Sequence, residues 1–254
     1  MWHGDYLFLL RNLVVRDFKI RYRNMSLGLL WSLLNPLVLM TVLALVFTKF
    51  MPNTSIQQYP VFLLCGLVPY NFFSLAWNNG TTSIASNATL IKRVPVPREI
   101  IPIASVLSNC THLLIQIGLL LGFVIAMVGH VTVAWLWLPV IWLFLVIFVC
   151  GMVMTTAALD VYVRDMRYVV ESAITLLFWL VPIVYSSDSI PPQYRFLIDY
   201  NPIAAVVVCM RIVLINAHAP ELATLMKLAL CSCLMFAIGW FTFRRMKDHF
   251  FDYL

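Results

Sequence analysis

The length of its uncharged stretches is the feature that most constrains how this chain can fold. Residues 100–159 contain no Asp, Glu, Lys or Arg, and residues 50–91 form a second uncharged stretch. A helix that crosses the ~30 Å hydrocarbon core of a bilayer needs about 20 apolar residues, so these stretches are long enough for several crossings. Charged residues make up only 11% of the chain, whereas soluble domains carry about 25%. We therefore expect an integral membrane protein.

The positions of charges and turn residues predict six membrane-spanning helices. Gly129-His130 marks the turn that divides the longest uncharged stretch into two spans. The expected spans are roughly residues 27–47, 60–77, 101–128, 135–159, 168–185 and 222–243. The expected fold class is all-α integral membrane, with residues 1–254 forming a single transmembrane domain. Gly118 and Gly122 form a GxxxG pattern, which lets helices approach closely.

Two further segments are unsuited to crossing a bilayer. Residues 5–24 carry basic residues on one face and apolar residues on another, which is typical of an amphipathic helix in the membrane interface. An ordinary cytosolic helix is the alternative for this segment. The apolar stretch 203–215 is too short to span and holds Arg211, so we expect residues 187–218 to form a short re-entrant or interfacial hairpin on the outer side.

The distribution of Lys and Arg predicts which side of the membrane each loop occupies. Six spans return the chain to its starting side, and with both termini inside, thirteen of the 17 basic residues lie in inner segments. Cytoplasmic loops of membrane proteins carry such an excess. We therefore expect a multi-pass protein with cytoplasmic N- and C-termini. The net charge of +6 then reflects orientation and not nucleic-acid binding.

The motifs of ATP-binding and metal-dependent enzymes are missing from the sequence. Neither a G-x-x-x-x-G-K-[ST] loop nor an H-E-x-x-H pair occurs, and the six cysteines lack paired zinc spacing. The middles of the expected spans hold no Asp, Glu, Lys or Arg, although ion-coupled transporters and membrane enzymes keep such groups at membrane depth. We expect a non-enzymatic chain without its own cofactor or metal, so its energy must come from a partner.

The inner loop between the second and third expected spans is the candidate contact for that partner. It combines an apolar pair, a basic pair and two prolines that end any short helix there. The candidate residues are Asn87, Leu90, Ile91, Lys92, Arg93, Pro95, Pro97, Arg98 and Glu99. A plain solvated loop is the alternative reading of residues 87–99.

Several long motifs, in order along nearly the whole chain, resemble one family of membrane proteins. They include Arg16-Asp-Phe-Lys-Ile-Arg-Tyr-Arg23, Leu27-Gly-Leu-Leu-Trp-Ser-Leu-Leu-Asn-Pro36, the loop 87–99 and Phe178-Trp-Leu-Val-Pro-Ile-Val-Tyr185. The family is that of the polysaccharide and polyol-phosphate export permeases, which are membrane subunits of type-two ABC exporters of the O-antigen (Wzm-like) kind.

The resemblance implies a function and a set of partners. Two permeases would form a channel and bind two copies of a separate ABC ATPase, which would carry ATP and Mg²⁺. The substrate would be a polysaccharide on polyprenyl pyrophosphate, exported across the bacterial inner membrane for lipopolysaccharide biosynthesis. Residues 87–99 would be the coupling helix that docks in the ATPase, and residues 5–24 would form a gate at the inner interface.

Two groups of residues are candidates for handling such a substrate. Arg and Lys favour phosphate oxygens, so Arg16, Lys19, Arg21 and Arg23 are candidates to meet the pyrophosphate. Anionic lipid head groups explain the same charges. Aromatic rings stack on apolar sugar faces, which makes the channel-lining candidates Trp31, Tyr70, Phe72, Phe73 and Trp77. An aromatic belt at the membrane interface explains these residues equally well.

Other functions remain open at the level of sequence. A capsule or teichoic-acid permease of the same class would differ only in its substrate. An integral membrane enzyme acting on polyprenyl-linked sugars would need a convergent acidic or histidine site, and the sequence offers none. A drug or small-lipid exporter would be favoured by large outer domains or an attached ATPase, and neither is found.

Overall fold

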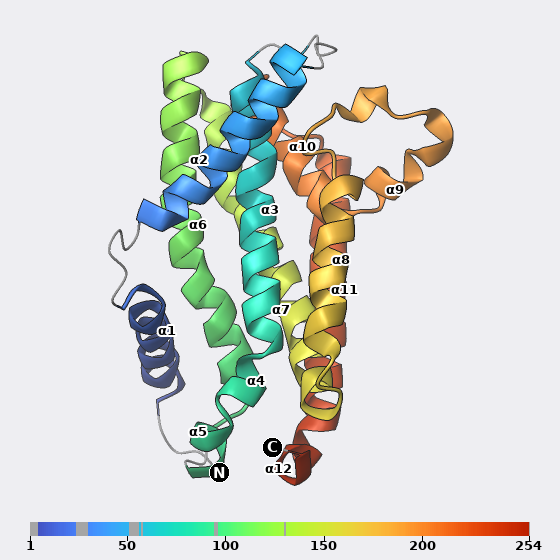
Figure 1. The fold of residues 1–254 in the computed structure, drawn as a ribbon. Coiled ribbons are helices and arrows are strands. Elements are labelled where there is room, and N and C mark those ends of the chain that lie inside the picture. The colour runs from blue at the N-terminus through green and yellow to red at the C-terminus, as the bar shows by residue number, and fades with distance from the viewer. Residues whose placement is uncertain are drawn as a thin grey trace.

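The computed structural model describes residues 5–23, 30–50, 56, 58–93, 96–129 and 131–253. Throughout these ranges the regular elements are helices, with no strand, as expected for an all-α protein. The long helices run side by side as an elongated bundle (Figure 1).

Five helices are long and apolar enough to cross a membrane. They are α2 (Leu30–Leu45, continued by a π-helical turn to Phe50), α3 (Tyr59–Thr81), α6 (Ile100–Met127), α7 (Leu138–Tyr162, preceded by a 3-10 turn from Val133) and α11 (Leu222–Met246). Each falls on an expected span, so five of the six predicted spans are confirmed as candidate membrane helices. They are uncharged for most of their length, which is why a bilayer can accommodate them.

The fifth expected span, residues 168–185, is helical only in its first part. α8 covers Met166–Leu180, and its 15 residues extend about 22 Å, short of the hydrocarbon thickness. Pro182 stops the helix, because a proline ring disfavours helical backbone at the preceding residue, and Val181 is indeed extended with φ −81° and ψ 134°. The chain then continues as a buried, non-helical segment up to Val184. The expectation of a helix through Tyr185 was wrong for this reason.

The segment after α8 folds into short helices and one longer one. α9 (Phe196–Asp199) precedes α10 (Pro202–Leu214), and the helical stretch from Pro192 meets α10 at 94°. The side chain of Asn201 accepts hydrogen bonds from the amides of Ile203 and Ala204, and Pro202 occupies the first turn of α10. The residues Asn-Pro therefore fix where α10 begins. α10 packs against α3 and α7. If the bent pair is one broken span, the candidate spans number six.

The tightest helix packing joins α7 and α11. A Cβ added at Gly239 would lie 2.2 Å from the backbone oxygen of Gly151, so the two backbones touch. Glycine at both positions permits this approach. By contrast, Gly118 and Gly122 of α6 have no neighbour within 4 Å of an added Cβ. The GxxxG pattern therefore does not join helices within the described part of the chain.

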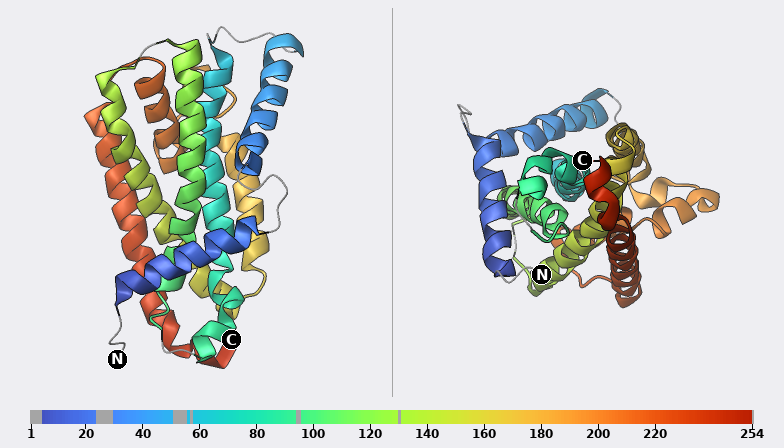
Figure 2. Two further views of the ribbon diagram at one scale, coloured as in Figure 1. Left: turned by 90° about the vertical axis from the view of Figure 1, so that its left-hand side faces the viewer. Right: turned by 90° about the horizontal axis from the view of Figure 1, so that it is seen from below.

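The two ends of the bundle differ in what they carry. α1 (Tyr6–Tyr22) crosses the outside of the bundle obliquely and packs on α6 (Figure 2). The short helices α4 (Ser83–Ser86), α5 (Ala88–Arg93) and α12 (Phe250–Tyr253) lie near the same end, which we call the α5 end (Figure 1). α9 and α10 lie toward the opposite end, the α10 end.

Candidate functional site

A small hydrophobic core, separate from the main core of the bundle, holds the α5 end together. It joins α4, α5 and the start of α6 to the ends of α7 and α11 and to α12. Ile91, expected from the sequence to help form an apolar knob for the partner, is only 3% exposed and packs in this core. Leu90 is half-buried, whereas the basic pair Lys92 and Arg93 is exposed. The face that α5 offers to a partner is thus mainly basic. Pro95 lies outside the described residues.

The C-terminal segment 247–253 braces the chain that follows α5. Arg98 donates a hydrogen bond to the backbone oxygen of Lys247, and the ammonium of Lys247 lies 3.3 Å from Glu99 Oε1. The hydroxyl of Tyr162 donates to the backbone oxygen of Met246 at 2.7 Å. Arg98 and Glu99 were both predicted to contact the partner, and the structure shows them bonded within the chain. Pro97 lies half-buried beside them.

Arg16 connects α1 to the same region. Its Nη2 donates to Asp17 Oδ1 at 2.7 Å and to Asn87 Oδ1 at 2.8 Å. Asn87 lies between α4 and α5, so one guanidinium joins the predicted gate helix to the predicted coupling segment. Lys19 and Arg23 are exposed. The side chain of Arg21 lies outside the described residues.

A polar cavity of about 490 Å³ lies next to this bond, between the second half of α1 and the bundle. We call it the α1 cavity. Hydroxyl, amide and charged side chains from α1, α3, α4 and α6 make up most of its wall: Arg16, Asp17, Asn79, Thr82, Ser83, Ser86, Asn87, Ser105 and Ser108. Such a wall can form many hydrogen bonds to a hydroxyl-rich or phosphorylated group.

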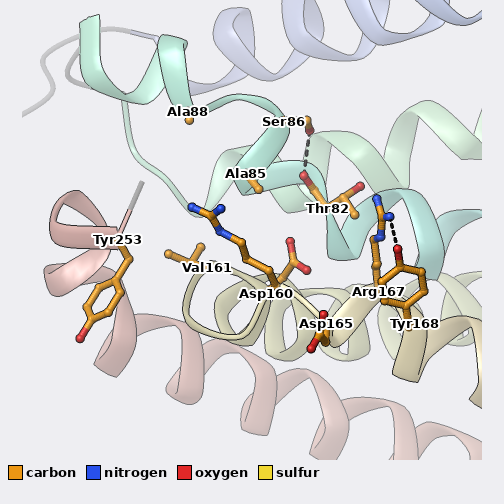
Figure 3. A pocket seen from close by; sticks show the side chains of 11 residues that line it. Thr82, Ala85, Ser86, Ala88, Asp160, Val161, Asp165, Arg167, Tyr168 and Tyr253 are labelled. Carbon is orange, nitrogen blue, oxygen red and sulfur yellow. Dashed lines mark hydrogen bonds between the residues drawn. The ribbon is translucent and has the colours of Figure 1, made fainter.

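A second cavity of about 560 Å³, the α5 pocket, lies between α4, α5 and the turn from α7 to α8 (Figure 3). Asp160, Arg164, Asp165 and Arg167 line it, together with Tyr168 and small residues of α4 and α5. Acidic and basic residues alternate here, yet among the described residues these four form no ion pair within 4 Å. Arg167 instead donates to the hydroxyl of Tyr168. Arg164, Asp165 and Arg167 are exposed in the α5 pocket, whereas Asp160 is buried.

Four of the five channel-lining candidates are packed inside the single chain. Tyr70, Phe72, Phe73 and Trp77 of α3 are buried, and the ring of Tyr70 meets Phe178 of α8 at 5.4 Å between centres. Tyr70 also donates a hydrogen bond to a backbone oxygen of α8. These rings attach α8 to α3. Trp31 on α2 is different, with 53% of its surface exposed. Lining of a channel stays a prediction for all five.

Large apolar faces remain exposed on α2 and α8. On α2 the exposed residues recur at helical spacing, and on α8 only Val170 is buried; the exposed set includes Leu34, Val38, Val42, Val169, Leu176 and Trp179. Seen from the α5 end, α2 lies at the edge of the bundle (Figure 2). Extended apolar faces such as these contact lipid or another protein chain.

Most of the chain matches one known protein family. The model of the ABC-2 type transporter family matches residues 9–215. The chain belongs to the ABC-2 type transporter family. This agrees with its several candidate spans and confirms the family resemblance found in the sequence motifs.

Within this family, the chain is similar to named transport proteins over most of its length. The chain is 33% identical over 213 residues to an O-antigen export system permease protein of Klebsiella pneumoniae, covering 83% of this chain and 82% of that protein. It is 28% identical over 248 residues to an O-antigen export system permease protein of Myxococcus xanthus, covering 97% and 95%. It is 26% identical over 245 residues to a polysialic acid transport protein of Escherichia coli, covering 93% and 92%.

Proposed function

We propose that this chain is the permease subunit of an ATP-driven exporter that moves a polyprenyl-pyrophosphate-linked polysaccharide of the O-antigen type across the bacterial inner membrane. The observation that carries the proposal is its similarity, over 97% of its length, to a protein named as an O-antigen export permease. The absence of a P-loop from the sequence supports a transport subunit whose ATP and Mg²⁺ are bound by a separate chain.

The α5 end is the surface that would meet the ATPase, with both termini in the cytoplasm. Lys92 and Arg93 are exposed there and would pair with acidic groups of the partner. The buried Ile91 and the bonds of Arg98 and Glu99 would hold α5 firmly against the ends of α6, α7 and α11. A segment held in this way transmits movement of the ATPase to the long helices, whereas a solvated loop would not.

α1 and its cavity would receive the lipid-linked head group. Arg16 lines the α1 cavity, and Lys19 on α1 and Arg23 just after it add exposed positive charge. Guanidinium groups bind phosphate oxygens through paired charge-assisted hydrogen bonds, and the hydroxyl and amide wall suits the first sugar. Membrane lipids with anionic head groups would compete for the same charges.

A homodimer would supply the translocation channel. The exposed apolar faces of α2 and α8 are the surfaces that a second copy would cover, and isologous pairing of one face is the commonest symmetry of such assemblies. Trp31 would then face the channel directly. The buried rings of Tyr70 and Phe73 would support its wall by fixing α8 to α3.

A capsule-type polysaccharide is the alternative substrate. The similarity to a polysialic acid transport protein over 93% of the chain favours it. Teichoic acid would require the same architecture with another polymer. An enzyme acting on polyprenyl-linked sugars is the less favoured alternative; the described residues contain no group of three or more His, Cys, Asp or Glu that could hold a metal ion.

The test is purification of the permease with candidate ATPases, followed by ATP hydrolysis and glycan transport in vesicles. We expect a complex of two permeases and two ATPases whose hydrolysis responds to lipid-linked glycan. Transport of O-antigen but not capsule polymer would decide between the two substrates. A chain that purifies alone, binds no ATPase and chemically modifies a polyprenyl-linked sugar would overturn the proposal.

A further inference from the structure

Arg211 is a buried positive charge in α10. The residue is 8% exposed, and its guanidinium carbon lies 3.4 Å from the ring centre of Phe62. Its Nη2 donates to the backbone oxygen of Ile183 at 2.8 Å. The hydroxyl of Tyr59 donates to the next carbonyl, that of Val184, also at 2.8 Å. Together these bonds satisfy backbone groups that the break after α8 leaves outside any helix.

Nη2 of Arg211 also donates to the backbone oxygen of Phe62 at 3.4 Å, and none of these contacts supplies a full negative charge. Carbonyl dipoles and an aromatic face attract a cation only partially, and no Asp or Glu of the described residues forms an ion pair with Arg211. The Nε atom is buried without a hydrogen-bond partner. A buried charge is costly unless it is paired. An ionisable residue inside a membrane domain is therefore a sign of function.

A cavity of about 470 Å³, the Arg211 cavity, adjoins this side chain. Phe62 and Ile212 contribute apolar wall, and Ser186, Ser187 and Asn216 contribute hydroxyl and amide groups. The volume falls in the range of about 300–1,000 Å³ found for small-molecule sites. One cation, a few polar groups and an apolar wall suit a small ligand that has both an anionic group and hydroxyls.

We propose that the Arg211 cavity binds an anionic sugar unit. Its carboxylate or phosphate pairs with the guanidinium, its hydroxyls bond to Ser187 and Asn216, and its ring lies against Ile212. Arg favours carboxylate and phosphate because its planar fork makes two parallel charge-assisted bonds. That this unit belongs to a glycan leaving at the α10 end rests on the proposed function, whereas the binding does not.

Ligand binding to the purified full-length permease in nanodiscs tests the proposal. Calorimetric titration would use glucuronate, glucose 6-phosphate, glucose and inorganic phosphate as probes. We expect at least one of the two anionic sugars to bind at least tenfold more tightly than both glucose and inorganic phosphate. The carboxylate and phosphate arms show which anion the site prefers. Equal binding of glucose, or equal binding of phosphate alone, would overturn the assignment to an anionic sugar.

Two variants and a control separate binding from folding. Arg211→Gln should abolish binding of the anionic sugar, and Arg195→Gln, an exposed arginine after α8, should leave it unchanged. Arg211→Gln also removes hydrogen bonds from the guanidinium to backbone oxygens, so a second variant is needed. Ile212→Trp fills the cavity and keeps the guanidinium. Loss of binding in Ile212→Trp at an unchanged melting temperature supports the proposal, and full binding in this variant refutes it. The measurement needs no transport, so failed export and a failed site give distinguishable results.

Discussion

Replacing Phe250 by alanine should detach the C-terminal segment 247–253 from the α5 end. Phe250 is 0% exposed, and its ring meets Phe243 edge-on at 5.4 Å and Tyr162 at 6.1 Å between centres. Burial of a Phe side chain and its aromatic pairing together contribute about 3 kcal/mol. A loss of this size shifts the docking equilibrium of the segment roughly a hundredfold, since about 1.4 kcal/mol is tenfold.

The detached segment would no longer hold Lys247 against Arg98 and Glu99, so the chain that follows α5 would lose these stabilising contacts. We expect the ATPase to bind and hydrolyse ATP, but the glycan exported per ATP to fall severalfold. Hydrogen exchange of the amides of residues 246–250, measured by mass spectrometry, should rise by about the same hundredfold as the docking equilibrium. Transport into vesicles made from the same samples measures the coupling ratio, that is, the glycan exported per ATP hydrolysed.

The matched control is Phe241→Ala, because Phe241 lies on α11 with 64% of its surface exposed. It should change neither amide protection nor export per ATP. If Phe250→Ala raises exchange but leaves the coupling ratio intact, the segment is docked without bracing α5. If exchange itself does not change, the assignment of the docking energy to Phe250 is wrong.

Three further changes have outcomes that follow from the packing and the charges. Gly239→Ala forces apart the backbones of α7 and α11 and should lower the free energy of unfolding by about 1–3 kcal/mol. Gly118→Ala, in open space within α6, should raise it by about 0.5–1 kcal/mol, because glycine is a poor helix former. Reversing Lys92 and Arg93 to Glu should reduce co-purification of the ATPase without lowering the melting temperature of the permease. Arg16→Gln should lower export and weaken binding of a short polyprenyl pyrophosphate, measured with and without ATPase, and unchanged binding would exclude a phosphate contact.

The positions of the long helices could be predicted from the sequence because charges mark where a chain must leave the bilayer. The stretch 100–159 gave α6 and α7 with the turn at Gly129. The end of α8 was also encoded, in Pro182, but a proline inside an apolar run reads equally as a kink or as a stop. Only packing of the following residues against α3 and α10 decides for a stop here.

The partners of the coupling segment could not be predicted. Amphipathic patterns show that Ile91 is apolar and Glu99 charged, but not that a core and a lysine about 150 residues away receive them. The glycine contacts likewise depend on which helices meet, which the sequence does not show. A GxxxG pattern is local and visible, yet the glycines that touch, Gly151 and Gly239, lie on two helices and match no local motif. Arg211 was visible as a charge, but not as an unpaired one.

The hydrogen bond from Arg16 to Asn87 makes α1 and α5 thermodynamically dependent on each other. A phosphate that drew the guanidinium toward itself would compete with Asn87, and so the head group would change how α5 is held. Linkage requires the reverse effect to have the same size. Whatever factor the head group applies to ATPase docking, docking must apply to head-group affinity, so one arginine would let substrate recognition and energy supply report on each other.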